Sequence, residues 1–250
     1  MIGRLEIRLQ TDGIINHQMS SLFHGAMMEL LSNEYATFLH ESRIHPYTQH
    51  LEQQNGEWYW IICALNQDAV LEILQNGLSK TDKILLKKRN QEIRFAEKKL
   101  ETIPYQKLTE CFYSESSSRY MDIQFLTPTA FKQRGRYVFY PDIRCIFQSL
   151  MNKYDASVEN ERYLDEETLD ELCEHTEVVR YDLKSTSFHL EGVRIPSFYG
   201  KITLRFGGTQ TMANFANILF RFGTYSGIGI KASIGMGAIR IIEEGGKKHD

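Results

Sequence analysis

Residues 222–237 read FGTYSGIGIKASIGMG, which places five glycines within fifteen residues near the C-terminal end of the chain. Glycine lets backbone N–H groups approach an anion without a side chain in the way. The segment also carries one cation, Lys231, and the hydroxyls of Ser226 and Ser233. We therefore predict a backbone-lined phosphate site. A merely flexible turn is the alternative, although the interleaved apolar residues favour a segment that packs down.

Two nucleotide-binding motifs resemble this segment without matching its context. Residues 227–232 satisfy G-x-G-x-x-A, but a dinucleotide fingerprint follows a strand and opens a helix. Here the glycines follow a helix predicted at 212–222 and precede a strand predicted at 238–242. The P-loop string G-x-x-x-x-G-K-[ST] does not occur in the chain. We expect no cofactor.

Hydrophobic periodicity predicts strands and helices in a similar order in both halves of the chain. In the first half we predict strands at 1–9, 58–65, 80–89 and 92–102, helices at 17–31 and 68–75, and an irregular stretch at 32–54. In the second half we predict strands at 120–126, 178–190, 193–206 and 238–242, with helices at 143–154, 168–175 and 212–222. This order predicts an α+β fold of tandem ferredoxin-like (RRM-like) domains with antiparallel sheets. We place the domains at 1–115 and 116–250, with a serine-rich linker at 114–118.

Composition and charge narrow the class of protein. The 250 residues are 42% hydrophobic and 24% charged, as in globular proteins, and the net charge is −3. An RNA site therefore requires local clustering of cations, because acidic residues gather between Glu159 and Glu177 on what we predict to be a solvated helix face. The N-terminus reads as a strand, no long apolar run occurs, and four cysteines lie far apart. These features predict a cytoplasmic protein with free thiols, no disulfide or zinc site, and no membrane segment.

Three histidines lie close together in the sequence: His24, His40 and His45. Cleavage of RNA without a metal requires a base for the 2′-hydroxyl and an acid for the 5′-oxygen, and histidine suits both roles near neutral pH. A nearby Lys or Arg would stabilise the charge on the phosphorane. A metal site is the other functional reading, but the spacing of His40, His45 and His50 is unusual for zinc. We expect no metal.

Five strings together carry a resemblance to a known family. They are LFHGAM at 22–27, YATFLHE at 35–41, YDLKSTSF at 181–188, IPSFYG at 195–200, and the glycine-rich segment at 222–237. This combination resembles the CRISPR-associated repeat-processing endoribonucleases, the Cas6 family, and members from type III-A systems in particular. The resemblance implies two ferredoxin-like domains. It also implies metal-independent cleavage of precursor RNA within each CRISPR repeat by 2′-OH attack, leaving a 2′,3′-cyclic phosphate and a 5′-hydroxyl.

The resemblance also assigns roles to residues. His40 falls on the family's catalytic histidine, and His24 falls where several members have a tyrosine that assists proton transfer. Where many members have a lysine, the nearest candidates are His45 and Arg43, so we rank His40 above His24 and both above His45. RNA contacts are expected from Lys231 and the rest of its segment, namely Ser226, Gly227, Gly229, Ser233 and Gly235. Lys132, Arg134 and Arg136, with Arg144 beyond them, either extend this RNA track or form an ordinary charged hairpin.

The implied partners are precursor and guide RNA, with transient hand-over of the guide to a type III-A (Csm) effector complex in antiviral defence. Assembly of two copies as a homodimer is left open. Two other functions also remain open. One is a non-catalytic repeat RNA-binding protein of the same family. The other is a ferredoxin-like domain that binds a nucleotide or a protein partner on the glycine-rich segment.

Overall fold

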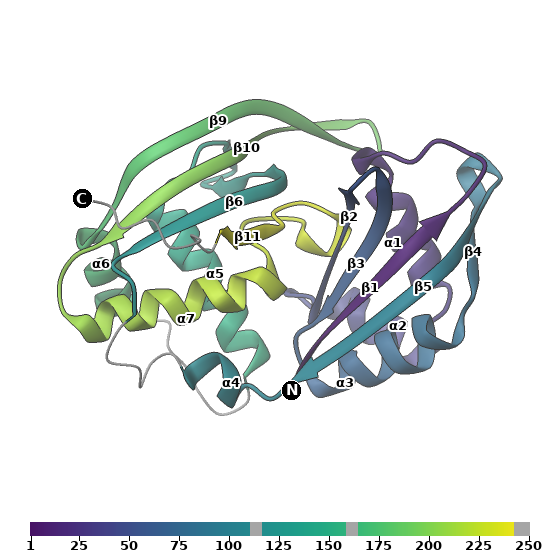
Figure 1. Ribbon diagram of the computed structural model, residues 1–250, viewed down its shortest axis with the longest axis horizontal. Coiled ribbons are helices and arrows are strands. Elements are labelled where there is room, and N and C mark those ends of the chain that lie inside the picture. Colours follow the sequence, from purple (N-terminus) through teal and green to yellow (C-terminus); the bar gives the residue numbers. More distant parts are fainter. Residues whose placement is uncertain (111–116, 159–164, 243–250) are drawn as a thin grey trace.

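The computed structural model describes residues 1–110, 117–158 and 165–242. Two antiparallel sheets lie side by side, and helices cover one face of each (Figure 1). The predicted α+β architecture of tandem ferredoxin-like units is confirmed. Across the part of the chain that the structure describes, every helix is too short or too polar to span a bilayer.

The first sheet has the strand order β2-β3-β1-β5-β4. Its strands are β1 (Ile2–Gln10), β2 (Tyr47–Gln54), β3 (Glu57–Ala64), β4 (Lys83–Leu86) and β5 (Gln91–Ile103). Its helices are α1 (Ser20–Met28), α2 (Asn33–Glu41) and α3 (Gln67–Ala69), which continues as wider turns over Val70–Gly77. In β1 the apolar Leu5 and Ile7 are fully buried, whereas Arg4 and Glu6 alternate with them on the other face. This alternation fixes which face meets the helices.

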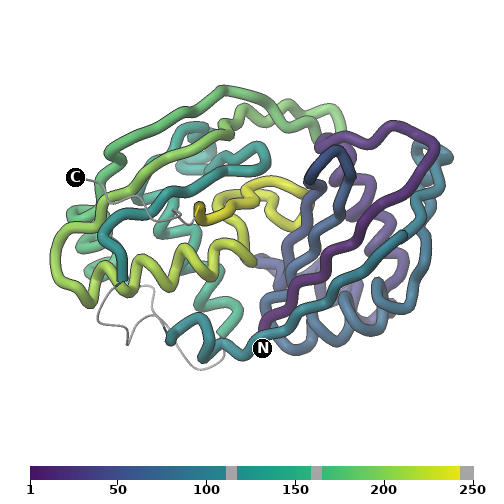
Figure 2. Tube along the Cα trace, in the orientation of Figure 1, coloured from purple at the N-terminus to yellow at the C-terminus, as the bar shows by residue number. Residues whose placement is uncertain are grey.

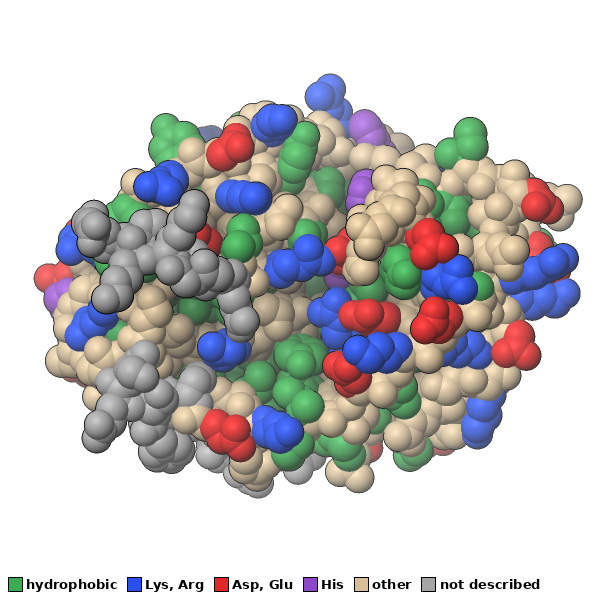
Figure 3. Space-filling view, viewed as in Figure 1, with side chains coloured by type: hydrophobic (Ala, Val, Ile, Leu, Met, Phe, Trp, Pro, Cys, Tyr) green, Lys and Arg blue, Asp and Glu red, His purple; other side chains and the backbone are tan. Residues whose placement is uncertain are grey.

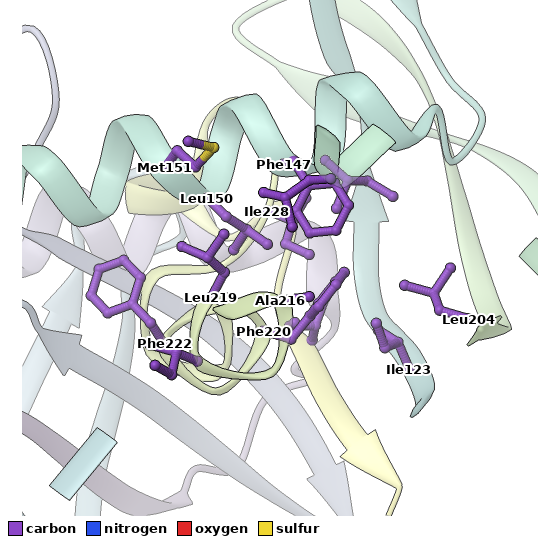
Figure 4. Close-up of a cluster of buried hydrophobic side chains, with 14 of the residues drawn as sticks. Ile123, Phe147, Leu150, Met151, Leu204, Ala216, Leu219, Phe220, Phe222 and Ile228 are labelled. Carbon is purple, nitrogen blue, oxygen red and sulfur yellow. The ribbon is translucent and has the colours of Figure 1, made fainter. Parts of the chain in front are cut away.

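The second sheet has the strand order β11-β6-β10-β9. Its strands are β6 (Tyr120–Thr129), β9 (Thr176–Leu190), β10 (Val193–Phe206) and β11 (Ile239–Ile242), and its helices are α5 (Ile143–Ser157), α6 (Glu166–Glu174) and α7 (Gln210–Ser226). A short helix, α4 (Gln106–Thr109), follows β5, and β7 (Phe131–Gln133) pairs with β8 (Arg136–Val138) as a small hairpin. The core forms where α5 and α7 pack together through Phe147, Leu150, Leu219 and Phe220 (Figure 4).

The prediction that residues 32–54 are irregular is wrong, because they contain α2 and β2. Ser32 begins α2 by accepting a hydrogen bond from the Tyr35 backbone N–H, an ordinary N-cap. Strand β2 is polar in sequence yet buried over Tyr47–Glu52. The polar side chain of Gln49 can be buried because it accepts a hydrogen bond from the buried Trp60 indole at 2.8 Å. Burial on both faces removes the apolar–polar alternation by which a strand is recognised.

Smaller differences concern element ends. Helix α7 continues to Ser226, so residues 222–226 of the glycine-rich segment are helical, and β4 is shorter than the strand predicted at 80–89. The predicted domain boundary after residue 115 and residues 114–116 of the linker lie outside the described residues, and the boundary stays a prediction. Glu159 and Glu161 of the acidic run also lie outside them. The part of that run on α6 is largely exposed, as predicted.

Contacts between the two halves occur at both ends of β2. The Thr48 hydroxyl donates a hydrogen bond to the Tyr225 carbonyl at 2.6 Å, and Arg240 on β11 pairs with Glu52. Burial alone would raise the pKa of Glu52, but its contacts with His50 and Arg240 lower the pKa to about 2. The β9–β10 hairpin also reaches over the loop that precedes α1 (Figure 2). The halves are thus held by charged and polar contacts as well as by packing.

The Arg240–Glu52 pair gives a first prediction. Arg240→Met is expected to lower the free energy of unfolding at pH 7 by roughly 1–3 kcal/mol, because it leaves a charged carboxylate that is only 9% exposed without its cation. Arg205→Met is the matched control, since Arg205 pairs on β9–β10 with a Glu177 side chain that is 60% exposed. Its loss should stay below about 1 kcal/mol. Urea unfolding measures both values, and equal losses would contradict the role given to Glu52.

Side chains of both signs are interspersed on the face shown in Figure 3. Elsewhere in the described structure, neighbouring strand residues form ion pairs, such as Arg4 with Glu6 and Lys99 with Glu101. A site for an anion has to be sought where cations lack acidic partners.

Candidate active site

Two consecutive helices and the strand that follows them bring the three predicted histidines together. His24 lies on α1, His40 in the last turn of α2, and His45 in the connection that leads into β2. His24 Nε2 lies 2.7 Å from the Tyr47 hydroxyl, and the His45 ring stacks on the Tyr47 ring with centroids 5.5 Å apart. Tyr47, the first residue of β2, therefore connects two of the histidines.

The histidines also influence one another electrostatically. Burial, followed by the charges of His45 and His40, lowers the pKa of His24 to about 4. Burial, followed by the charges of His40 and Lys231, lowers the pKa of His45. Burial raises the pKa of Tyr47, so its hydroxyl keeps its proton. At neutral pH both His24 and His45 are neutral imidazoles, which can accept a proton.

A cavity of about 530 Å³ opens beside this cluster, between the two halves of the molecule. The first half contributes Arg43, His45, Tyr47 and Thr48, and the second half contributes side chains of β7, α5 and the glycine-rich segment. The lining residues, all within the described ranges, include the cations Arg43, Lys132, Lys153 and Lys231 and no Asp or Glu. In a chain of net charge −3, this cavity is a place where phosphates would be attracted.

The glycine-rich segment forms one wall of the cavity and is held closely against the protein. Gly229 N–H donates to the Ser149 hydroxyl at 2.8 Å, and Ile228 N–H donates to the Gly237 carbonyl at 2.8 Å. A side chain at Gly235 would meet Ser20 on α1, so the segment also contacts the first half. Lys231 takes a left-handed backbone conformation, with φ of +61°, and its side chain stays exposed.

The structure places most, but not all, of the predicted residues in this site. The cavity is lined by His45, Arg43, Lys132, Ser226, Gly229, Lys231 and Ser233. Ser226 is fully buried, and its hydroxyl donates to the Gly227 carbonyl. Gly227 and Gly235 shape the segment without lining the cavity. Arg134 and Arg136 lie exposed in the β7–β8 hairpin outside it, while Arg144 forms ion pairs with Glu166 and Asp170.

Three residues of the site have no counterpart in the sequence predictions: Tyr47, Ser149 and Lys153. Tyr47 was missed because the sequence predicts an irregular stretch where β2 lies. Ser149 and Lys153 belong to no motif, and both lie on a helix whose other face is apolar. Within the described part of the chain, no three His, Cys, Asp or Glu side chains are grouped as metal ligands. The expected absence of a metal stays a prediction.

The low pKa of His24 predicts how stability depends on acid. The folded-state pKa of about 4 lies below the ordinary value of 6.5, so between these pH values the unfolded chain takes up a proton that the folded chain does not. The free energy of unfolding therefore falls as pH falls, by roughly 2 kcal/mol between pH 7.5 and 5 from His24 alone.

His24→Gln is expected to remove this part of the acid sensitivity, whereas His189→Gln, at an exposed position on β9, should keep it. Urea unfolding at both pH values gives the comparison, because the other titrating groups are common to all three proteins. An acid-induced loss in His24→Gln as large as in the parent chain would show that His24 is not held neutral.

Known proteins resemble this chain both in sequence and in fold. A family model described as CRISPR-associated endoribonuclease Cas6 matches residues 123–239. A CRISPR-associated endoribonuclease Cas6 of Streptococcus thermophilus is 36% identical over 239 residues, covering 92% of this chain and 95% of that protein. One of Mycobacterium tuberculosis is 33% identical, covering 96% and 78%. A solved Cas6 product complex has a similar fold, with a TM-score of 0.80 at 22% identity, covering 97% of this chain and all of that one.

Proposed function

Because this chain belongs to the Cas6 family of CRISPR-associated endoribonucleases, we propose that it cleaves the precursor RNA of a CRISPR array within each repeat. The observation that carries this proposal is the position of three neighbouring histidines beside a cavity with four cations and no carboxylate in its lining. Proton-transfer groups and phosphate-attracting groups are both needed to break an RNA phosphodiester, and the two kinds meet at this cavity.

The proposed reaction is attack of a 2′-hydroxyl on the adjacent phosphorus. The O–P bond that forms closes a 2′,3′-cyclic phosphate, and the bond to the 5′-oxygen breaks to leave a 5′-hydroxyl. One histidine accepts the proton of the 2′-hydroxyl, and another donates a proton to the leaving oxygen. His40, the most exposed of the three, leads the assignment, followed by His24 and then His45. Arg43 and Lys231 would stabilise the charge on the phosphorane.

RNA contacts are proposed for the groups that border the cavity and are open to solvent. These are Lys231, Ser233 and Gly229 of the glycine-rich segment, with Arg43 and Lys132 on the opposite walls. Ser226, Gly227 and Gly235 act by shaping that segment. Arg134 and Arg136 would extend the basic surface along the β7–β8 hairpin.

Delivery of the product to a type III-A (Csm) effector complex is a further part of the proposal. It is supported by the resemblance of residues 181–188 and 195–200, which lie on the paired strands β9 and β10. Co-purification of the Csm subunits with guide RNA made by this chain tests it. Guides that load equally well when another nuclease produces them would limit the role of this chain to cleavage.

The experiment that tests the nuclease is incubation of the purified protein with end-labelled repeat RNA in EDTA. A single cut that leaves a cyclic phosphate supports the proposal. A cut that appears only after a divalent ion is added would overturn the metal-independent mechanism. A clear gel shift with no cut under either condition would instead favour a repeat RNA-binding protein without catalysis.

A further inference from the structure

Lys153 lies on α5 at the cavity and has no place in the reaction described above. Its ammonium donates two hydrogen bonds of 3.0 Å each, to the carbonyls of Ser226 and Gly227. These carbonyls lie where α7 ends and the non-helical part of the glycine-rich segment begins. A lysine head group has three N–H donors, so one remains for a group inside the cavity that Lys153 lines.

A second residue of α5 fixes the same segment. Ser149 lies one helical turn before Lys153, on the same face of the helix, and accepts the hydrogen bond of Gly229 N–H at 2.8 Å. Lys153 and Ser149 therefore hold both ends of the stretch from Ser226 to Gly229. The opposite face of α5 is anchored in the core through Leu150 and Met151 (Figure 4). The ammonium is thus fixed in place before any ligand arrives.

None of the described residues that line the cavity with Lys153 carries a carboxylate that would neutralise it. The charged groups that line the cavity with it are Arg43 and His45 from the α2–β2 connection, Lys132 from β7 and Lys231 from the glycine-rich segment. Tyr47 and Cys145, which also line it, keep their protons because burial raises the pKa of each. Burial lowers the pKa of Lys153 itself to about 7. A buried ammonium among other cations is an unfavourable arrangement unless an anion joins it.

We propose that Lys153 binds a phosphate of the RNA from the floor of this cavity and, with Ser149, positions the glycine-rich segment against the same strand. This inference rests on the proposed function. It adds a specific RNA-binding residue that comes from the interior of α5, not from the exposed basic surface. The geometry requires a ligand with anionic oxygens, because the donor is an ammonium and the lining offers no competing carboxylate.

Phosphate binding by Lys153 couples RNA affinity to pH. The free protein holds this ammonium only below about pH 7, and a bound phosphate would restore its charge at higher pH. RNA binding then takes up a proton, so the Kd should rise roughly tenfold between pH 7 and 8.5. A residue that only supports the fold would not produce this proton uptake.

The test measures the Kd for the repeat RNA with Lys153→Met, Lys153→Arg and the control Lys83→Met. Lys83 is exposed on β4, the edge strand farthest in the sheet from the β2 side of the cavity. The RNA carries a 2′-deoxy nucleotide before the mapped cut so that it stays intact. We expect Lys153→Met to weaken binding about tenfold at pH 7, to lose the pH dependence, and to reduce the salt slope by about one phosphate contact. Lys153→Arg should bind without the pH dependence, and Lys83→Met should behave as the parent chain.

A parent-like Kd, pH dependence and salt slope in Lys153→Met would overturn the role of Lys153 while leaving the nuclease intact. If Lys153→Met loses both RNA binding and the folded state, as seen by circular dichroism, Lys153→Arg provides the test in its place. This variant keeps a fixed charge, so a pH dependence like that of the parent would also overturn the inference. If the parent chain binds the natural repeat but does not cut it, the proposed nuclease fails, and the Lys153 measurements on that RNA still stand.

Discussion

Replacing His40 with alanine is expected to slow RNA cleavage by about 10²- to 10⁴-fold, the usual contribution of a general acid or base. The change removes the imidazole that we propose exchanges a proton with the RNA, but it leaves the cations of the cavity in place. RNA affinity should therefore remain close to that of the parent chain, because phosphate contacts dominate binding. His40 lies at the exposed end of α2, so the substitution leaves no buried gap.

The effect is measured as the single-turnover cleavage rate at saturating protein, with the Kd measured in parallel. His189→Ala is the matched control, because it removes an exposed imidazole on β9 outside the cavity lining. A His40→Ala rate equal to that of this control would remove His40 from the mechanism. His24 and His45 would then be the remaining pair, and the same assay would be applied to each.

Gly237→Ala is expected to destabilise the protein by about 3 kcal/mol or more, the largest effect on stability that we predict. Gly237 has a φ of +73°, and a Cβ there would lie 1.9 Å from the Ile228 carbonyl oxygen. Relief of that clash requires the backbone at Gly237 to move away from the backbone at Ile228. The hydrogen bond from Ile228 N–H to the Gly237 carbonyl would then be lost, and the cavity wall would move with it.

Gly192→Ala is the control that distinguishes the energetic cost of the clash from the cost of the left-handed backbone conformation. Gly192, in the turn between β9 and β10, has a φ of +83° and no atom within 4 Å of an added Cβ. Its cost should be about 1–2 kcal/mol, that of the left-handed conformation alone. Urea unfolding gives both free energies, and RNA binding by Gly237→Ala should be weakened as well. Equal costs for the two variants would mean that the contact with Ile228 is not a constraint.

The strands and helices predicted correctly are those with a clear period. β1 alternates apolar and charged residues, and β9 and β10 are long strands separated by Glu191 and Gly192, both with positive φ. α2 and β2 were missed for a physical reason. The buried polar residues of β2 are satisfied by tertiary partners that the local sequence does not reveal. Gln49 is bonded to Trp60 of the first half, and Glu52 is paired with Arg240 of the second.

The sequence likewise predicted only part of the candidate site. Clustering along the chain identified His24, His40 and His45, and glycine content identified residues 223–237. Lys153 could not be found in this way, because its significance comes from Ser226 and Gly227, more than seventy residues later in the chain. Tyr47 could not be found in this way either, because its hydroxyl reaches His24 only after α1 and β2 have packed together.

The cavity takes its one lining imidazole, that of His45, from the first half of the chain and three of its four cations from the second. Each half therefore holds only part of the site, and neither half could be inherited alone as a working unit. A crossover in the gene between the two halves would join His45, whose pKa Lys231 helps to lower, to the lysines of another protein. Hybrids assembled from two homologous genes should therefore lose cleavage when the junction falls between the sheets. They should keep it when the junction falls in the loop between β1 and His17, because the histidines and all four cations then come from one gene.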